Sequence, residues 1–211
     1  MSLLDEDVAA YLRGLALTDE DPLLAEMHAL ALERSFPIVG PEVGRFLAQL
    51  VHLLRARRVF EMGSGFGYSA LWLGRALPED GELVCTDGDA ANLERARGFH
   101  ARAGIAGKVS YLRGHAQDLL AVTPGLFDLI VCDIEKEEYP ELPELLRGHL
   151  RVGGAVLVDN LLWDGRVADP EDEEPSTLGV RAYTRRMWEN PEYLSSLLPV
   201  RDGVGLSIRL R

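Results

Sequence analysis

Three oxygen-bearing side chains stand at the ends of two apolar runs in the second half of the chain. Asp133 follows Leu129–Cys132, and Asp159 and Asn160 follow Ala155–Val158. Carboxylate and carboxamide oxygens suit a hard divalent cation, Mg²⁺ first and Mn²⁺ or Ca²⁺ as alternatives, with positions left for water or substrate. Asp and Asn at a single strand end more often cap a turn. Both motifs together, at the ends of neighbouring strands, favour a metal site.

Lys136 follows Asp133 after three residues and lies within reach of whatever such a cation holds. Its ammonium group could bind a substrate oxygen, or lose its proton in an apolar setting and act as a base. The alternative is a surface lysine paired with Glu135 or Glu137. A zinc site is disfavoured, because the chain has no histidine or cysteine cluster with zinc-ligand spacing.

A glycine-rich turn follows an earlier apolar run, and its glycines would let a ligand approach the backbone at the start of a helix. The spacing is G-x-G-x-G, which differs from the G-x-G-x-x-G of pyrophosphate binders. Asp87 ends the next run, where an acid can accept both hydroxyls of a ribose, although a helix N-cap is the alternative and Asp89 serves that role equally well. Turn and acid together indicate a nucleoside-containing ligand. The turn reads Glu61-Met62-Gly63-Ser64-Gly65-Phe66-Gly67-Tyr68-Ser69.

Further candidates follow the third run and lie near the end of the chain. At Gly114-His115-Ala116-Gln117 the small residue leaves room for a flat ring, which Gln117 could hydrogen-bond, and we give His115 a binding role rather than a catalytic one. Aromatic residues could wall an acceptor pocket, although aromatics more often belong to the core. The acidic segment 169–174 is a solvated loop or a mobile lid. The aromatic candidates are Tyr68, Trp163 and Trp188.

Short apolar runs alternating with helical stretches must position these residues. Such alternation, with nearly unbroken apolar strands, predicts a parallel sheet covered on both faces. We expect a doubly wound α/β fold with a C-terminal antiparallel hairpin, and a single domain 1–211 in which a helical segment 1–57 precedes a cofactor-binding core 58–211. The expected strands are Val59–Met62, Leu83–Thr86, Val109–Leu112, Leu129–Cys132, Ala155–Val158, Tyr193–Leu198 and Val204–Leu210. The expected helices are Leu4–Leu17, Pro22–Arg34, Glu42–Leu54, Tyr68–Leu77, Ala90–Ala103, Gln117–Val122, Tyr139–Leu150 and Leu178–Trp188.

Composition narrows the class of protein. The 211 residues carry a formal net charge of −12, which disfavours broad binding to a phosphate backbone without ruling out a local contact with RNA. No apolar run approaches the ~18 residues of a membrane span, and the acidic start of the chain is unlike a signal peptide. Cys85 and Cys132 lie far apart inside apolar runs and form no CxxC pair. We therefore expect a cytoplasmic protein.

From about Pro37 to the C-terminus the chain resembles the cation-dependent class I O-methyltransferases that use S-adenosylmethionine, of the catechol and caffeoyl-CoA type. The glycine turn is a weak part of this resemblance, and the other two motifs together are a strong one. Those motifs are Asp133-Ile134-Glu135-Lys136-x-x-Tyr139 and Asp159-Asn160-Leu161-Leu162-Trp163-x-Gly165-x-Val167. The resemblance implies a Rossmann-like methyltransferase fold with a seven-stranded, mostly parallel sheet.

The resemblance also implies a role for each candidate residue. The metal ligands of the family correspond to Asp133, Asp159 and Asn160. Its general base corresponds to Lys136, and the expected catalytic residues are Lys136 and Asp133. The cofactor S-adenosylmethionine would contact Asp133 as well, together with the ribose acid Asp87, the methionine-end residues Val39, Glu61, Gly63 and Ser69, and the adenine residues His115 and Ala116. Two departures stand out: Ser64 replaces a threonine, and Thr184 replaces an asparagine near the acceptor.

The implied reaction is an in-line displacement of the sulfonium methyl by a hydroxyl of a small, catechol-like aromatic acceptor, whose two neighbouring oxygens chelate the cation. Relatives of this kind suggest a homodimer, with the N-terminal helices as candidates for its interface. Three alternatives stay open. They are a nicotinamide oxidoreductase, which would share the glycine turn and Asp87, a methyltransferase for hydroxylated uridine in tRNA, and a cofactor-binding module without turnover.

Overall fold

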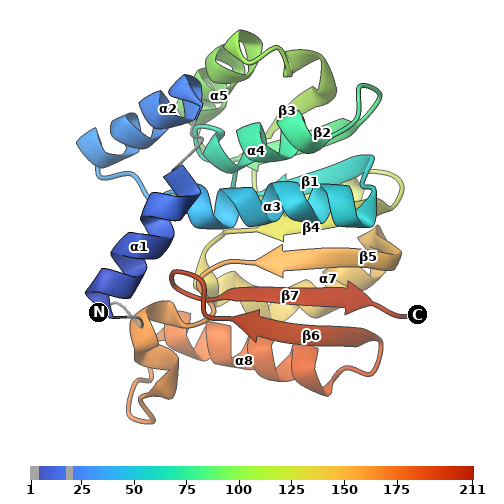
Figure 1. The fold of residues 1–211 in the computed structure, drawn as a ribbon. Coiled ribbons are helices and arrows are strands. Elements are labelled where there is room, and N and C mark those ends of the chain that lie inside the picture. Colours follow the sequence, from blue (N-terminus) through green and yellow to red (C-terminus); the bar gives the residue numbers. More distant parts are fainter. Residues whose placement is uncertain (1–4, 18–20) are drawn as a thin grey trace.

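A computed structural model describes residues 5–17 and 21–211 of the chain. Its described residues form one seven-stranded sheet in the order β3-β2-β1-β4-β5-β7-β6 (Figure 1). The first five strands run parallel, and the C-terminal hairpin joins antiparallel to β5 through β7. The predicted doubly wound sheet with a terminal hairpin is therefore confirmed. The strands are β1 (Arg58–Met62), β2 (Glu82–Asp87), β3 (Val109–Arg113), β4 (Phe127–Cys132), β5 (Leu150–Val158), β6 (Tyr193–Leu198) and β7 (Val204–Arg209).

Helices cover both faces of the sheet, with α3 and α4 on one face and α7 and α8 on the other (Figure 1). The α-helices are α1 (Glu6–Leu17), α2 (Pro22–Glu33), α3 (Gly40–Leu54), α4 (Tyr68–Ala76), α5 (Ala90–Arg102), α6 (Ala116–Val122), α7 (Leu142–His149) and α8 (Pro175–Glu189). Short 3₁₀ segments are η1 (Ala106–Lys108), η2 (Lys136–Glu141) and η3 (Trp163–Ala168). No helix among the described residues is long and apolar enough to cross a membrane.

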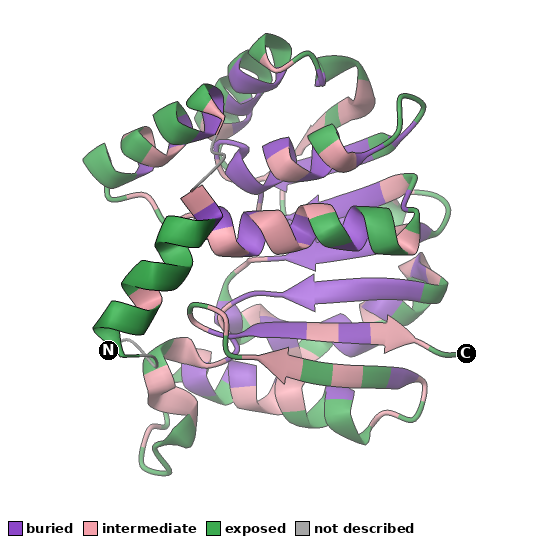
Figure 2. Ribbon diagram, in the orientation of Figure 1, coloured by how far each residue is buried: buried purple, intermediate pink, exposed green. Residues whose placement is uncertain are grey.

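The central strands are buried on both sides, which explains their unbroken apolar sequences (Figure 2). Successive side chains of β4 show the alternation. Leu129 and Val131 pack with residues from α2, α3, α4 and α5. Ile130 and Cys132 pack on the other side with α6, α7 and α8. Because both layers hold the strands in register, the ends of the parallel strands stay at fixed positions along one edge.

Several helix bounds differ from the sequence prediction, and proline explains two of the differences. Helix α3 begins at Gly40 instead of Glu42, because Pro41 lies in the first turn, where no backbone N–H is needed. The predicted helix Tyr139–Leu150 is divided into η2 and α7, and Pro140 lies within η2. Leu150, the predicted last residue of that helix, is the first residue of β5. At the N-terminus, the predicted first residue Leu4 lies outside the described residues.

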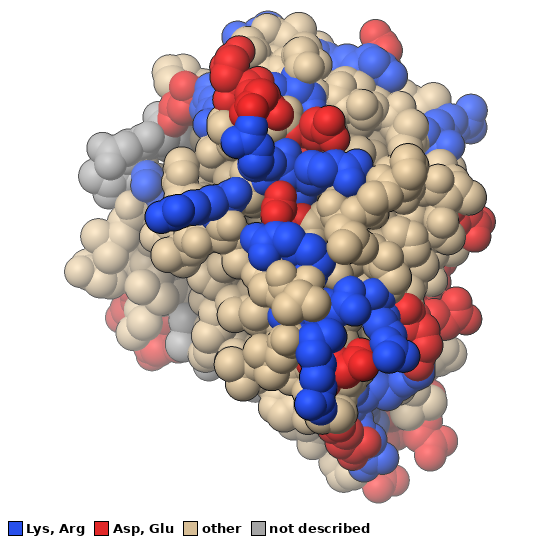
Figure 3. Space-filling view, turned by 90° about the vertical axis from the view of Figure 1, so that its right-hand side faces the viewer, with Lys and Arg blue, Asp and Glu red and all other residues tan. Residues whose placement is uncertain are grey.

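Basic side chains form a band on the edge of the sheet where the parallel strands begin (Figure 3). Arginines of this edge are held by acids and by carbonyl groups. Arg58 binds Glu82, with Nε and Oε2 2.9 Å apart, and Arg151 pairs with Asp128 and also donates to the carbonyl of Leu54. Much of this positive charge is therefore already paired within the protein.

Candidate functional site

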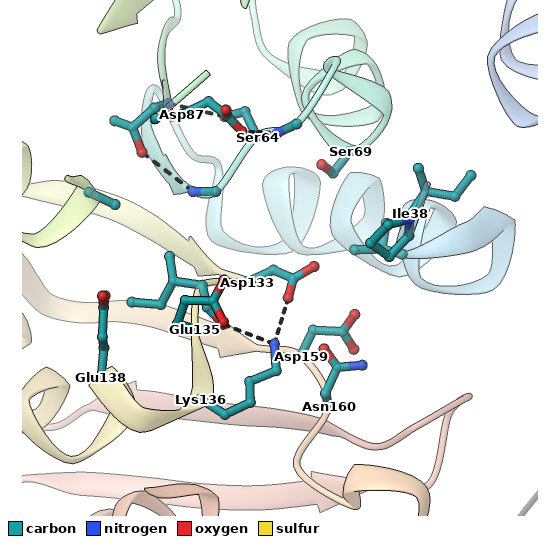
Figure 4. Close-up of a pocket in the computed structure, with 18 of the residues that line it drawn as sticks. Ile38, Ser64, Ser69, Asp87, Asp133, Glu135, Lys136, Glu138, Asp159 and Asn160 are labelled. Atoms are coloured by element: carbon teal, nitrogen blue, oxygen red, sulfur yellow. Dashed lines mark hydrogen bonds and ion pairs between the residues drawn. The ribbon is translucent and has the colours of Figure 1, made fainter. Parts of the chain in front are cut away.

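A cleft of about 980 Å³ lies at the carboxyl ends of the parallel strands. The loops after β1 to β5, the segment before α3 and the β6–β7 turn line it (Figure 4). We call the part formed by Gly63–Ser69, Asp87 and His115 the glycine end, and the part formed by Asp133, Lys136, Asp159, Asn160 and Trp163 the carboxylate end. The sequence-predicted site residues on the cleft wall are Val39, Gly63, Ser69, Asp87, His115, Ala116, Asp133, Lys136, Asp159 and Asn160.

Glycines in the turn after β1 allow unusually close packing at the glycine end. Gly63 has a φ of +82°, and a Cβ atom there would lie 2.0 Å from the carbonyl oxygen of Asp133. Gly67 is the N-cap of α4 with a φ of +90°, and a Cβ atom there would lie 2.6 Å from Nε2 of His100. Side chains at these positions would push the turn away from β4 and α5. The turn therefore keeps its backbone at the cleft wall and Ser69 in the first turn of α4.

Asp87 belongs to the cleft wall rather than to the helix cap. Its carboxylate accepts hydrogen bonds from the backbone N–H of Gly65 at 2.9 Å and from that of Asp89 at 2.8 Å. The N-cap of α5 is Asp89, whose side chain accepts from the N–H of Ala91. The capping alternative considered for Asp87 is thus served by its neighbour. Asp87 ties the glycine turn to the end of β2 while its side chain faces the cleft (Figure 4).

Glu61 lies beneath the glycine end, at 1 % exposure, and is not itself on the cleft wall. Burial raises the pKa of its carboxyl to about 7, and the charge of Asp133 adds to the rise, while Ser64, Ser69 and Cys85 oppose it. Neither carboxylate oxygen makes a hydrogen bond of normal geometry within the described part of the chain. A buried carboxyl group in this state gains most from a cationic partner that enters the cleft.

The carboxylate end joins residues from two adjacent strands. Asp133 follows β4 and donates its backbone N–H to Met62, and Asp159 follows β5 and donates to Cys132, which continues the pattern of the parallel ladder. Asp159 is 6 % exposed. Burial raises the pKa of its carboxyl to about 7, and the negative charge of Asp133 contributes to this rise. The two carboxyl groups therefore interact, as the sequence hypothesis required.

Lys136 is buried against the same pair of strands, at 7 % exposure. Its Nζ donates to Asp133 Oδ1 at 2.8 Å and to the carbonyl oxygen of Ile134 at 3.0 Å (Figure 4). The ammonium group also lies 5.1 Å from the ring centroid of Tyr139 and 5.6 Å from that of Trp163. The alternative of a surface lysine paired with a neighbouring glutamate is therefore wrong.

Among the described residues, no three His, Cys, Asp or Glu side chains gather in a metal-binding arrangement. The carboxylate end offers two carboxylates, and the amide of Asn160 lies next to them along the chain. Asn160 has a left-handed backbone with φ of +60°, and its Nδ2 donates to Asp202 Oδ2 at 3.2 Å. Asp202 also lies on the cleft wall and is not among the site residues that the sequence predicted.

Several secondary candidates lie elsewhere or have other partners. Gln117 donates to the carbonyl oxygen and the carboxylate of Glu138 instead of lining the cleft, and Trp188 is exposed on α8 away from it. Thr184 is also absent from the cleft wall, whereas Trp163 lines it and Tyr68 both lines it and belongs to the core.

His115 stays at the glycine end in an ion pair. Its Nε2 lies 3.0 Å from Glu138 Oε1, and this partner raises the pKa of the imidazole. The binding role of His115 stays a prediction.

The acidic segment 169–174 is fastened to α8 and to its own loop. The guanidinium group of Arg181 donates to four carbonyl groups, and Arg166 Nε donates to Asp172 Oδ2 at 2.7 Å. These bonds fix the loop next to Trp163, whose indole N–H donates to Ser176. The four carbonyls belong to Arg166, Val167, Asp169 and Asp172.

Known proteins resemble the chain over nearly its full length. The sequence profile of the O-methyltransferase family matches residues 16–210. A catechol O-methyltransferase from Niastella koreensis is 32 % identical, covering 96 % of both chains, and caffeoyl-CoA O-methyltransferase 1 from Arabidopsis thaliana is 28 % identical, covering 99 % of this chain and 86 % of the plant protein.

Solved structures agree with the sequence relatives. The O-methyltransferase TomG from Streptomyces achromogenes, in complex with S-adenosylmethionine, superposes with a TM-score of 0.87 at 30 % identity, over 97 % of this chain and 96 % of that one. An O-methyltransferase from Bacillus cereus in complex with S-adenosylhomocysteine gives 0.86 at 27 % identity, over 96 % and 97 %. Fold, cleft and relatives thus lead to one conclusion: this chain belongs to the O-methyltransferase family and is an S-adenosylmethionine-dependent O-methyltransferase.

Proposed function

We propose that the protein methylates one of two neighbouring oxygens on a small, catechol-like aromatic acceptor, with a divalent cation, Mg²⁺ first, held by Asp133, Asp159 and Asn160. The observation that carries this proposal is the meeting of two interacting carboxyl groups, one almost fully buried, beside a buried lysine. Paired, desolvated carboxyl groups are costly unless a cation or a proton compensates them.

The donor set fits a hard cation. It offers two carboxylates and one amide oxygen, and it offers no sulfur or imidazole ligand. A bound divalent cation would make the acceptor hydroxyl easier to deprotonate and would hold two adjacent oxygens in a fixed orientation. The chain's own part is to keep the three ligands at the ends of two rigid strands.

Lys136 would act on the acceptor oxygen that is methylated. Its ammonium group is fixed by Asp133 and the carbonyl of Ile134 beneath the ring of Trp163. From there it can stabilise negative charge that develops on the oxygen, or accept the proton. Attack by the oxygen forms the new O–CH₃ bond as the S–CH₃ bond breaks, and the electron pair returns to sulfur. Holding both reactants in line can lower the barrier by about 7 kcal/mol or more.

At the glycine end the residues suit a cofactor with a cationic amino group, a ribose and a flat ring. Glu61, buried and without a described hydrogen-bond partner, suits the amino group together with Ser69 and the backbone of Val39. Asp87 suits the ribose hydroxyls, and His115 with Ala116 the adenine. With the cofactor held by these residues, its sulfonium methyl would face the carboxylate end of the same cleft.

The acceptor class is supported by relatives whose names include catechol and flavonoid substrates. Nucleic acid is a weaker alternative, because the net charge is −12 and the basic band lies on the strand edge opposite the cleft (Figure 3).

We also propose a homodimer that uses α1, because this helix exposes the side chains of Val8, Tyr11, Leu12 and Leu15. The free thiols of Cys85 and Cys132 suit the cytoplasm.

Methyl transfer to catechol and to phenol, with EDTA and with Mg²⁺ restored, tests the proposal. We expect transfer to catechol, little transfer to phenol, loss of activity in EDTA and recovery with Mg²⁺. Transfer that is indifferent to EDTA would reject the cation. Binding of S-adenosylhomocysteine without transfer to a broad panel of acceptors would favour the module without turnover, and binding of NADH in its place would revive the oxidoreductase alternative.

A further inference from the structure

The β6–β7 turn docks onto the loop that carries Asp159 and Asn160. Backbone N–H groups of Leu161 and Leu162 donate to the carbonyl oxygens of Gly203 and Asp202, at 2.9 and 2.8 Å. The loop and the turn therefore form one hydrogen-bonded unit. Gly203, with φ of +86°, is part of this fit, because a Cβ atom there would lie 2.5 Å from the Leu162 side chain.

The carboxylate of Asp202 makes two separate contacts with this loop. Oδ1 accepts the backbone N–H of Asp164 at 2.6 Å, and Oδ2 accepts Nδ2 of Asn160 at 3.2 Å. A carboxylate can only accept hydrogen bonds, and a backbone N–H can only donate. Asn160 must therefore present its NH₂ group to Asp202, and its amide oxygen is left on the other side.

That other side is the carboxylate end of the cleft. Asn160 lies beside Asp159, with its side-chain oxygen on the side that faces Lys136 (Figure 4). If the side-chain amide of Asn160 were free to flip, its oxygen and its NH₂ group would exchange places. In part of the molecules the NH₂ group would then face a cation. The contact with Asp202 removes that exchange.

We propose that Asp202 is a positioning residue that fixes the amide of Asn160 with its oxygen towards the cation. This inference rests on the proposed function, because it assumes that a cation binds at the carboxylate end. Asp202 would act through Asn160 and not through a reactant. Partners of this kind typically change metal affinity by about 10- to 100-fold when they are replaced.

Replacement of Asp202 by asparagine gives a specific expectation. The backbone N–H of Asp164 would still demand an acceptor, so the new amide would turn its oxygen there and its NH₂ group towards Asn160. Asn160 would then flip to accept that bond and would present its own NH₂ group to the cation. Asp202→Asn should therefore weaken Mn²⁺ binding by about 10- to 100-fold, measured on the unliganded protein by electron paramagnetic resonance or calorimetry.

Two variants separate this effect from the loss of one negative charge. Asp164→Asn removes a carboxylate from the same cleft wall without touching the side-chain bond between residues 160 and 202, and should change Mn²⁺ affinity by no more than about threefold. The exchange variant combines Asp202→Asn with Asn160→Asp and keeps the charge and composition of wild type. In it, a hydrogen-bond acceptor at position 160 faces a donor at position 202. We expect it to recover most of the lost affinity.

Four outcomes decide the matter. Weak binding in Asp202→Asn with recovery in the exchange variant supports the inference. Equal affinities of Asp202→Asn and Asp164→Asn, or no recovery, would overturn it while the cation site stands. Absence of Mn²⁺ binding in wild type would overturn the cation site and this inference together. Loss of S-adenosylhomocysteine binding in Asp202→Asn would show a general structural role and overturn the assignment to Asn160.

Discussion

The glycine end of the cleft is largely one continuous stretch of chain, Gly63–Ser69, whereas the carboxylate end draws Asp133 and Asp159 from two separate loops and borders on Asp202 from a third. At the glycine end, backbone groups make the close contacts: Gly65 donates to Asp87, and Gly63 lies against the carbonyl of Asp133. At the carboxylate end, side chains make them. The two ends are therefore expected to respond differently to substitution.

Each end nevertheless has one buried acid whose carboxyl pKa is raised to about 7, Glu61 beneath the glycine end and Asp159 within the carboxylate end. Burial is the main cause in both, and Asp133 adds to both. Under the proposed function each buried acid would receive one cationic ligand, an amino group beside Glu61 and a metal ion beside Asp159. The comparison predicts that the two sites can be disabled separately.

The largest expected effect is that of Asp159→Ala. Removing one of two charged ligands should lower methyl transfer by about 1,000-fold, the upper part of the range for loss of a single electrostatic group. Affinity for S-adenosylhomocysteine, measured by calorimetry, should change by less than about threefold. Glu137→Gln, which removes a carboxylate from the cleft wall near Lys136, is the control. Equal loss of transfer and of cofactor binding would show that the two ends are not separable.

Lys136→Met should lower kcat by about 100-fold, the lower end of the range for a group that moves or stabilises a proton. Because Lys136 forms an ion pair with Asp133, we expect its charge to matter most. Lys136→Arg keeps the charge and cannot give up a proton, so it should retain activity within about tenfold of wild type. A loss in Lys136→Arg as large as that in Lys136→Met would identify Lys136 as the base.

The difference between the two ends also explains what the sequence predicted. Residues that directly follow strands, such as Asp133 and Asp159, could be placed because the carboxyl ends of parallel strands share one edge. Asp202 could not, because its contact with Asn160 spans 42 positions and exists only since β7 inserts between β5 and β6.

Gln117 and Trp188 lie on helices, and the sequence did not predict which side of each helix faces the cleft. Helix α6 begins at Ala116, one residue earlier than predicted, and Gln117 meets Glu138 there instead of facing the cleft. In α8, Met187 packs into the core and its neighbour Trp188 is directed to solvent. A shift of one position on a helix turns a side chain by ~100°, and sequence alone left that phase open.

Glu61→Gln tests the glycine end in turn. If Glu61 binds the cofactor's amino group, loss of a charge-assisted hydrogen bond should weaken S-adenosylhomocysteine binding by about 10- to 100-fold at pH 8. In wild type the affinity should rise from pH 6 to pH 8, because the carboxyl must lose its proton to pair with the amino group and its pKa in the free protein is about 7. Calorimetry in buffers of different ionisation enthalpy should show proton release in wild type and little in Glu61→Gln. A pH-independent affinity in wild type would contradict this role.

Glu61 should also affect the stability of the folded protein, and here a rise in pH has the opposite effect to its effect on cofactor affinity. The pKa of Glu61 is raised on folding from 4.5 to about 7, so the folded protein binds this proton more tightly than the unfolded chain. Free energy of unfolding should therefore fall as the pH rises from 4.5 to 7, by up to about 3 kcal/mol. Glu61→Gln should lack this fall, so its Tm relative to wild type should be higher at pH 8 than at pH 5. Equal Tm differences at the two pH values would argue against a buried, titrating Glu61.

The smallest effect is expected at Arg201, which lies in the same turn as Asp202. Its Nη1 donates to the carbonyl oxygen of Ile38 at 2.7 Å, next to Val39, while its charge lowers the pKa of Asp159. Arg201→Gln should weaken S-adenosylhomocysteine binding by about two- to tenfold, the range for one hydrogen bond. Mn²⁺ affinity should stay equal or rise, because a positive charge near the carboxylates is lost. Arg185→Gln removes an exposed charge from α8 and is the control. A fall in both affinities would show that the turn supports the cleft as a whole, whereas opposite changes would show that its two residues serve the two ends independently.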